Sequence, residues 1–448
     1  MPASIGINPR KYLLLVTVII ILALSGQAQI FQVVHSFTGG LDGSHPQAGL
    51  TQDKAGNLYS TTTAGGYHGD DCVTSGCGAV IKLSRQGSGW VASPLYAFQG
   101  DGGGWLPDAG VIAGSQGNLY GTTSAGGAGN GGFGYGIVYS LQPSSHDCAG
   151  GACPWTETVL YQFAAGSDGW QPTLGTLAFD RAGNMYGTTE DGGSNGCYGG
   201  FGCGVVFQLT PSNGGWTETV LYSFAGAGDG AYPQSGLLLD QAGNIYGTAS
   251  SGGIGNCNAY VGGCGVVFEL TPTNGGWTET VLYSFTGGAD GGVPDGGLAF
   301  GPAGVLYGTT EAGGTGNGTV FELVPAHRSQ GTWALNTIYA FPGPGLPGPT
   351  ASVVLDAAGN LYGTTLNGPP DYPPCEGSIF KLSHSYGVWD YSLLHCFTGG
   401  SDGGQPYSPV TVDANGNLYG TAYEGGAYGD GVVWQLTPSS SAPGRPTE

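Results

Sequence analysis

Short apolar segments alternate with turn-forming residues along most of the chain. In one copy of this pattern, residues 175–180, 184–189, 204–209 and 216–224 are rich in β-branched and aromatic side chains. Each segment is bounded by Gly, Pro, Asn or Asp, as short antiparallel strands usually are. No stretch after residue 28 keeps the apolar period of a helix. The pattern therefore predicts an all-β protein built from units of four short strands.

The four-strand unit occurs seven times. Its most regular part is Gly-Asn-Leu-Tyr or a close variant, and successive copies are 61, 66, 60, 61, 55 and 57 residues apart. The copies begin at Gly56, Gly117, Gly183, Gly243, Gly304, Gly359 and Gly416. Repetition at a nearly constant spacing is typical of propellers and solenoids. Four antiparallel strands repeated seven times predict a seven-bladed β-propeller.

The two ends of the repeat region predict how the ring closes. Residues 30–37 resemble the fourth strand of the unit, and residues 432–436 resemble the third. The last copy therefore lacks its fourth strand, while the N-terminal region has one strand to spare. Pairing these two strands completes the last blade and removes an open sheet edge. We expect one propeller over residues 29–438.

A tight turn joins the first two strands of each unit. In the third copy, Asp180 can accept hydrogen bonds from the turn backbone, and Gly183 supplies a positive φ angle. The tyrosine that follows, Tyr186, falls at an apolar position. We interpret the turn motif as structural and the tyrosine as part of the core.

The charge of the chain excludes one class of partner. The sequence holds 30 acidic and 9 basic residues, which gives a net charge of −21. Phosphate backbones repel such a surface, so we expect no nucleic-acid partner. Anionic membranes are disfavoured as partners for the same reason.

The N-terminal segment predicts export. Arg10 and Lys11 precede the apolar run 12–24, and residues 26–28 are suited to cleavage. The run is short for a transmembrane span, although an uncleaved anchor is the alternative. We expect a signal peptide over residues 1–28, no membrane span after cleavage, and a disordered C-terminal tail over residues 439–448. The mature protein is then secreted, periplasmic or displayed at the cell surface.

Ten cysteines agree with an exported protein. Most of them form close pairs within single repeats, as expected for local disulfides. Zinc is the alternative, but the spacings are wider than Cys-x-x-Cys and each pair lies in a different repeat. The predicted disulfides are Cys72–Cys77, Cys148–Cys153, Cys197–Cys203, Cys257–Cys264 and Cys375–Cys396.

The longer loops of the predicted blades gather on one face of the ring, where binding residues usually lie. Six of the loops that lead into a new blade carry Asp-Gly, and the sixth blade carries a Pro/Gly segment instead. The aspartates could form an acidic ring at the channel mouth and hold a cation. The favoured interpretation is that each caps its own turn, because no calcium-loop motif is present. These aspartates are Asp42, Asp101, Asp168, Asp229, Asp290 and Asp402.

The same loops carry aromatic side chains with polar edges. Such rings stack on the apolar faces of sugars, and nearby Asp and Asn groups can bond to hydroxyls. The alternative is that the rings pack beneath their own loops. The candidate ligand-binding residues are His45, Trp105, Trp170, Tyr232 and Tyr407.

Catalytic chemistry has little support in the sequence. His45 and His68 fall in long loops of the first blade and could pair with Asp70 or Asp71. No nucleophile elbow, zinc-protease, phosphate-loop or dinucleotide motif accompanies them. We assign no catalytic residues and expect neither a cofactor nor a metal site.

The repeat resembles the bacterial tandem-repeat family called Gloeo/Verruco, or GloVer, repeats. The resemblance rests on three motifs, found here at residues 282–294, 187–193 and 265–270, and covers nearly the whole mature chain. It implies an exported or surface-displayed bacterial protein without an assigned biochemical role.

These observations favour a non-catalytic binding module. We expect a monomer that binds an extracellular glycan or a surface protein on the long-loop face. One alternative is an extracellular hydrolase or lyase that acts on polysaccharide. Another is a structural surface repeat with no small ligand.

Overall fold

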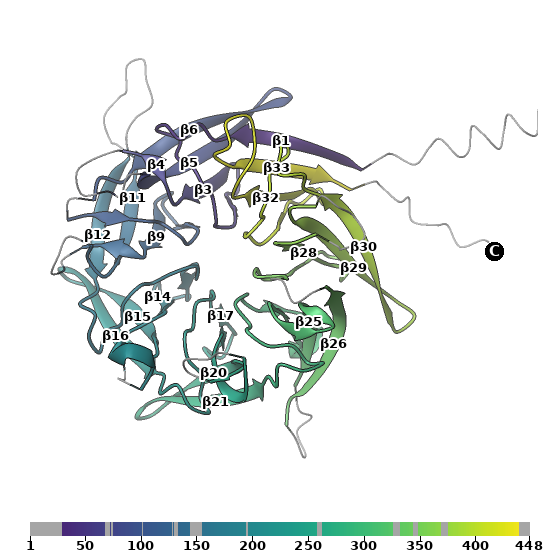
Figure 1. Ribbon diagram of the computed structural model, residues 1–448. Coiled ribbons are helices and arrows are strands. Elements are labelled where there is room, and N and C mark those ends of the chain that lie inside the picture. The colour runs from purple at the N-terminus through teal and green to yellow at the C-terminus, as the bar shows by residue number, and fades with distance from the viewer. Residues whose placement is uncertain are drawn as a thin grey trace, which may run out of the picture.

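The computed structural model describes most of residues 29–438, and the predicted signal peptide and C-terminal tail lie outside the described residues. Seven antiparallel sheets stand around a central channel, each with four main strands (Figure 1). The seven-bladed propeller predicted from the repeat is therefore confirmed. The gaps within this range are residues 68–71, 73–74, 101, 128, 130–132, 144–154, 194–195, 258–261, 326–331, 344–347 and 369–374.

Each blade runs from a very short inner strand, A, through B and C to an outer strand, D. Blade 1 comprises β2 (Thr51–Gln52), β3 (Leu58–Thr62), β5 (Gly76–Gln86) and β6 (Gly89–Ala97). Blade 2 comprises β8 (Ile112–Ala113), β9 (Leu119–Thr123), β11 (Ile137–Gln142) and β12 (Thr156–Gln162). Blade 3 comprises β13 (Ala178–Phe179), β14 (Met185–Thr189), β15 (Val205–Ser212) and β16 (Gly215–Ser223). Blade 4 comprises β17 (Leu238–Leu239), β18 (Ile245–Ala249), β20 (Val266–Thr273) and β21 (Gly276–Ser284).

The remaining blades follow the same order. Blade 5 comprises β22 (Ala299–Phe300), β23 (Leu306–Thr310), β25 (Gly316–Val324) and β26 (Ala334–Pro342). Blade 6 comprises β27 (Val354–Leu355), β28 (Leu361–Thr365), β29 (Ser378–Ser385) and β30 (Val388–Cys396). Blade 7 comprises β31 (Thr411–Val412), β32 (Leu418–Ala422), β33 (Val432–Thr437) and β1 (Ile30–Ser36). Minor elements are β4 (Gly65–Gly66), β7 (Gly104–Trp105), β10 (Ala125–Gly126), β19 (Gly252–Asn256), β24 (Gly313–Gly314) and the 3-10 turns η1 (Tyr198–Gly200) and η2 (Pro302–Gly304).

The N-terminal strand closes the ring. β1 pairs antiparallel with β33, and Phe31 lies opposite Leu436. Figure 1 shows the purple N-terminal strand beside the yellow C-terminal strand at this seam. Because the first described strand completes the last blade, the predicted closure is confirmed.

Six of the seven blades bury an aromatic side chain of strand C against a glycine of strand B, whereas blade 1 pairs Ile81 with Ser60. Phe207 is fully buried, and a Cβ atom on Gly187 would lie 2.6 Å from its ring. Gly247, Gly308 and Gly363 face Phe268, Phe321 and Phe380 in the same way. Burying a phenylalanine side chain contributes about 1.5–3 kcal/mol. The glycine of the Gly-Thr-Thr sequence is therefore required for packing.

Neighbouring blades are joined by a repeated hydrogen bond from the threonine after that glycine. Thr188 Oγ1 donates to the carbonyl oxygen of Ser235 at 3.1 Å, and Thr421 Oγ1 donates to that of Ala48 across the closing seam, also at 3.1 Å. The same bond occurs from Thr61, Thr248, Thr309 and Thr364. Among the described residues, Thr122 Oγ1 has no such partner. These bonds fix six of the seven blade entries against the blade before them.

The short turns between strands A and B are held by an aspartate. Asp180 accepts hydrogen bonds from the Ala182 and Asn184 amides, from Asn184 Nδ2 and from the Tyr186 hydroxyl, at 2.7–3.1 Å. Gly183 has a φ of +87°, and Tyr186 is 5% exposed. Burial raises the pKa of Asp180, but the hydrogen bonds outweigh burial and lower the pKa below its ordinary value. The structural interpretation of the turn and its tyrosine is confirmed.

Disulfides hold the longer loops. The predicted bridges Cys72–Cys77, Cys197–Cys203, Cys257–Cys264 and Cys375–Cys396 are formed. Cys148 and Cys153 lie outside the described residues. None of the helical segments in the described part of the chain is long and apolar enough to cross a membrane.

Candidate binding site on the long-loop face

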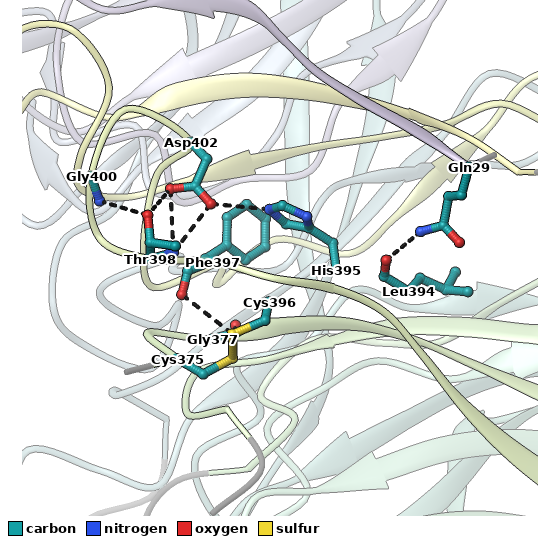
Figure 2. Close-up of polar contacts among 10 residues, drawn as sticks. All are labelled: Gln29, Cys375, Gly377, Leu394, His395, Cys396, Phe397, Thr398, Gly400 and Asp402. Atoms are coloured by element: carbon teal, nitrogen blue, oxygen red, sulfur yellow. Dashed lines mark hydrogen bonds and ion pairs between the residues drawn. A yellow bond between two sulfur atoms is a disulfide. The ribbon is translucent and has the colours of Figure 1, made fainter. Parts of the chain in front are cut away.

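The Asp-Gly aspartates are occupied by their own loops. Asp402 accepts hydrogen bonds from the Thr398 amide and hydroxyl and lies 3.1 Å from His395 Nε2 (Figure 2). Asp168 accepts hydrogen bonds from the Ala164 and Gly166 amides and from the Tyr161 hydroxyl. These contacts agree with the loop-capping interpretation.

The same contacts place these carboxylates away from the channel mouth. Tyr161, Tyr222 and Tyr283 belong to outer strands, and they donate to Asp168, Asp229 and Asp290. Asp42 is bonded in the same way by His35 of β1, while Asp101 lies outside the described residues. The Asp-Gly turn directly follows the outermost strand, so its side chain stays at the rim of the blade. The described members therefore do not form the predicted ring at the channel mouth.

The predicted aromatic residues fall into different environments. Trp105 is only 3% exposed, and its indole N–H donates to the Phe133 carbonyl at 3.2 Å. It packs beneath its own loop, so its faces are closed to a ligand, contrary to our expectation. Tyr232 is half-buried and packs against the core between blades 3 and 4.

His45 and Tyr407 lie together beside the channel. Each is half-buried, and their rings contact Tyr423 with centroid distances of 4.6 and 5.5 Å. The predicted partners of His45, namely His68, Asp70 and Asp71, lie outside the described residues.

Two backbone hydrogen bonds fix each loop that carries these residues. The Gln171 amide donates to the Tyr135 carbonyl of blade 2 at 3.1 Å, and the Gln171 carbonyl accepts from the Glu190 amide at 3.0 Å. The residue that makes both bonds has a positive φ angle, which is 55° for Gln171. That conformation costs about 1–2 kcal/mol for a residue other than glycine. Because it recurs in six blades, we interpret it as a structural device. The positions are His45, Leu106, Gln171, Tyr232, Val293 and Gln405.

Two positions of each blade are thereby brought to the channel mouth. One follows the loop proline, and the other follows strand B. Some of these positions, together with the blade entries, line a cavity of about 510 Å³, whose lining includes Asp108, Asp295, Glu311 and Tyr407. Asp108 accepts a hydrogen bond from the Ser124 hydroxyl, and Asp295 is hydrogen-bonded to Glu311. The Gln234 amide group donates to Glu190 at 2.9 Å.

Carboxyl groups from three blades repel one another at this mouth. Burial raises the pKa of Asp108 to about 6. Burial, and then the charges of Asp191 and Asp108, raise the pKa of Glu190 to about 7. Burial and the bonded Glu311 carboxyl raise the pKa of Asp295 well above its usual range. Within the described ranges, no group of three or more His, Cys, Asp or Glu side chains is arranged to hold a metal ion.

Sequence reasoning missed these carboxyl groups. The residues around them repeat from blade to blade, whereas the two mouth positions vary: Asp108 and Asp295 correspond to Gln47 and Gln234 in other blades. The variation of these two positions among otherwise similar repeats was the feature of the sequence that could have identified them. Which of the variable positions meet depends on the ring and not on local sequence.

A second hollow on this face is lined by three aromatic rings. Trp170 contacts Tyr135 and Phe201, with centroid distances of 5.8 and 5.3 Å and interplanar angles of 72° and 76°. The hollow has a volume of about 640 Å³, and its other walls are small residues such as Gly166 and Ser167. Phe201 is 55% exposed. Trp170 was predicted from the sequence, whereas Tyr135 and Phe201 were not.

The aromatic hollow and the acidic mouth are neighbours on blade 3. Trp170 and Asp191 form an antiparallel backbone pair, with hydrogen bonds of 2.9 and 3.1 Å in the two directions. Glu190 of the mouth directly precedes Asp191. Burial raises the pKa of Asp191 to about 6. One continuous surface therefore offers aromatic rings on one side and carboxyl groups on the other.

A disulfide holds the outer wall of the hollow. Cys197 and Cys203 bracket Phe201, and their Cα atoms are 5.2 Å apart. The Phe201 carbonyl accepts a hydrogen bond from the Gly192 amide at 2.8 Å. The bridge and this bond together position the exposed ring.

A family model matches nearly the whole propeller. The described Gloeobacter/Verrucomicrobia repeat matches residues 19–259, 130–343 and 316–443. The chain belongs to this family. The family membership that the repeat motifs predicted is therefore confirmed.

Solved structures are similar at low sequence identity. A protein of unknown function from Dyadobacter fermentans is 12% identical, with a TM-score of 0.41, and the match covers 92% of this chain and 99% of that one. A protein from Lactobacillus plantarum is 13% identical, with a TM-score of 0.47 and coverage of 82% and 96%. No curated protein matches this chain.

Proposed function

We propose that this protein is an extracellular, non-catalytic propeller that binds carbohydrate on its long-loop face. The observation that carries the proposal is the hollow formed by Tyr135, Trp170 and Phe201. Aromatic rings stack on the apolar faces of pyranose rings, and open rings flanked by small residues leave room for a sugar. Four disulfides in the described loops support a location outside the reducing cytoplasm.

The polar surroundings of the hollow suit sugar hydroxyls. Ser167 lines the hollow, and Asp191 lies opposite Trp170 on the adjoining backbone. Glu190 and Gln234 continue this polar surface towards the channel. Hydroxyl donors and carboxylate acceptors of this kind orient a ligand that the aromatic rings hold in place.

The loops that form the hollow are fixed before a ligand arrives. Tyr135 is tied to the Trp170 loop by the Gln171 amide, and Phe201 is tied by the disulfide and by Gly192. A binding surface that is already ordered loses less conformational freedom on association. This rigidity supports a binding role for the loops of blades 2 and 3.

Polysaccharide hydrolysis is the second candidate function, and the Asp295–Glu311 pair favours it. A carboxyl group with a raised pKa is the form that acts as a general acid. The two groups are hydrogen-bonded to each other, however, whereas glycoside hydrolysis requires two carboxyl groups separated by roughly 5–9 Å. That arrangement leaves no room for a glycosidic bond between them and favours binding over cleavage.

Replacing Trp170 tests the proposal. We expect Trp170→Ala to weaken glycan binding at least about tenfold, because buried aromatic anchors dominate such interfaces. Binding would be measured by calorimetry with the oligosaccharide retained most strongly in an immobilised polysaccharide panel, with reducing ends assayed in parallel.

Tyr386→Ala provides the matched control, because Tyr386 is a fully exposed aromatic residue in the turn between β29 and β30, on the opposite face. Unchanged affinity in the Trp170 variant would contradict the proposed site, and release of reducing ends would contradict a non-catalytic role.

A further inference from the structure

Positive charge is distributed very unevenly over the propeller. Lys54 and Arg181 lie in the short A–B turns, and Arg328 lies outside the described residues. Lys82, Arg85 and Lys381 lie on C strands. The sequence of the loops that form the long-loop face contains no lysine or arginine. These loops therefore supply no permanently positive side chain to balance the carboxylates of this face or to bind an anionic ligand.

Carboxyl groups surround the aromatic hollow on the same face. Asp168 directly follows Ser167 of the hollow. Its carboxylate accepts hydrogen bonds from two backbone amides, and these bonds stabilise its charged form. Asp191 and Glu190 lie on the other side. Because the net charge of the chain is −21, this field attracts cations to the face from solution.

Among these carboxylates, Asp191 is the one whose backbone pairs with that of Trp170. It is directly opposite Trp170 in an antiparallel pair with both hydrogen bonds formed, so the two side chains project to the same side. The Cβ atoms of such cross-strand partners are about 5 Å apart. Within the described part of the chain, no group donates a hydrogen bond to the Asp191 carboxylate, which is half-buried. A half-buried carboxylate without a donor is stabilised by a cationic partner.

We propose that the ligand of the hollow is an amine-bearing sugar, namely a polymer of hexosamine units whose amino groups are free and protonated. This inference rests on the proposed function and narrows its ligand class. The sugar ring stacks on the aromatic hollow, while the ammonium group lies between Asp191 and the Trp170 face. A cation over an indole ring beside a carboxylate gains from both the ring quadrupole and the opposite charge.

The aromatic hollow separates this ligand from other cations. A basic peptide would be attracted by the same charges but has no pyranose face to stack on the Trp170 group of rings. A neutral sugar would stack but would offer no positive charge to Asp191. The amine-bearing sugar is the class that uses both halves of the surface.

The test compares four probes on the purified mature chain by calorimetry. They are the β-1,4-linked glucosamine tetramer, its fully N-acetylated counterpart, cellotetraose and tetralysine, each at low and at high salt. We expect the glucosamine tetramer to bind at least tenfold more tightly than the acetylated one. High salt should reduce this difference, because it screens charge.

Two carboxamide variants locate the effect. Asp191→Asn should abolish the preference for the free amine, because a carboxamide has no negative charge to pair with an ammonium group. Glu424→Gln is the matched control, because Glu424 occupies the same register in blade 7, where it lies opposite Gly404 instead of a tryptophan. We expect Glu424→Gln to retain the preference.

The outcomes separate the inference from the proposed function. Equal affinity for free and acetylated tetramers would overturn the amine preference while leaving carbohydrate binding intact. Binding of tetralysine without any sugar, or no binding of any probe, would overturn both. An amine preference that survives in Asp191→Asn would contradict the assigned contact.

Discussion

Carboxylates play opposite roles at the two faces of this propeller. On the short-turn face, Asp53 and Asp180 each accept four hydrogen bonds from their own turn, and these bonds lower the pKa of each carboxyl below its ordinary value in spite of burial. At the channel mouth, Asp108 and Glu190 have few donors and face each other from different blades, and their pKa values are raised. The hydrogen bonds of the short turns stabilise the folded state, whereas the ionised carboxyl groups at the channel mouth destabilise it.

This difference shows which parts of the repeat are needed for folding. The Asp of the short turn recurs with its own donors in five blades, at Asp53, Asp180, Asp240, Asp356 and Asp413. The mouth carboxyl groups occur at only some of the equivalent positions, at Asp108 and Asp295 and at Glu190 and Glu311, and they disfavour one another. Groups that the fold does not require, and that burial disfavours, are typical of functional surfaces.

Removing a short-turn aspartate should have the largest effect on stability. We expect Asp53→Ala to lower the free energy of unfolding by about 2–3 kcal/mol, because two amides, Asn57 and Tyr59 lose a charged acceptor. Urea unfolding measures the change, with the exposed neighbour Lys54→Ala as control. Equal stability of the two variants would remove the contrast between the faces.

The carboxyl groups at the channel mouth should change how the free energy of unfolding depends on pH. Folding raises the pKa of Glu190 from 4.5 to about 7, so the folded state retains a proton that the unfolded chain releases. The free energy of unfolding therefore falls as the pH rises from 4.5 to 7, by about 1–2 kcal/mol for this partly exposed group. The turn aspartates act in the opposite sense, because their lowered pKa values cause loss of stability only as the pH falls below about 4.

Glu190→Gln tests this assignment. We expect the variant to flatten the slope between pH 4.5 and 7 and to leave the acid limb unchanged, as measured by urea unfolding across pH. Asp390→Asn, at an exposed position on β30, should keep the wild-type profile. A Glu190 variant with the wild-type slope would show that folding does not raise the pKa of Glu190.

The loop disulfide should have the smallest effect on stability and a clear effect on binding. Cys197→Ser with Cys203→Ser should cost about 1 kcal/mol, because the bridge closes a short loop. Glycan affinity should fall several-fold, since Phe201 loses its support. The same double change at Cys257 and Cys264 in blade 4 is the control, and an equal loss of binding there would argue against a local role for Phe201.

The fold was predictable because its causes are local and repeated. Each copy carries its own turn aspartate and glycine, and the spare strand 30–37 identifies the closing pair. The disulfides in the described loops followed from close cysteine spacing. The site was predictable only in part: Trp170 borders an open hollow, but Trp105, at the corresponding loop of the preceding blade, is buried under Phe133.

The remaining site residues depend on geometry between blades. Asp108, Glu190 and Asp295 are far apart in the sequence and interact because three blades point them at one channel. Tyr135 and Phe201 reach Trp170 from a neighbouring blade and from across a loop. No local pattern specifies these encounters, since they follow from the closure of the ring.

Hydrogen exchange on the full mature chain, with and without the glucosamine tetramer, tests the division between the faces most directly. We expect ligand-dependent protection at residues 164–171 and 190–204, which carry the hollow, and none at the short turns around residues 180–184. Protection of the short turns, or of neither region in the presence of bound ligand, would contradict the claim that the long-loop face of blades 2 and 3 is the binding surface.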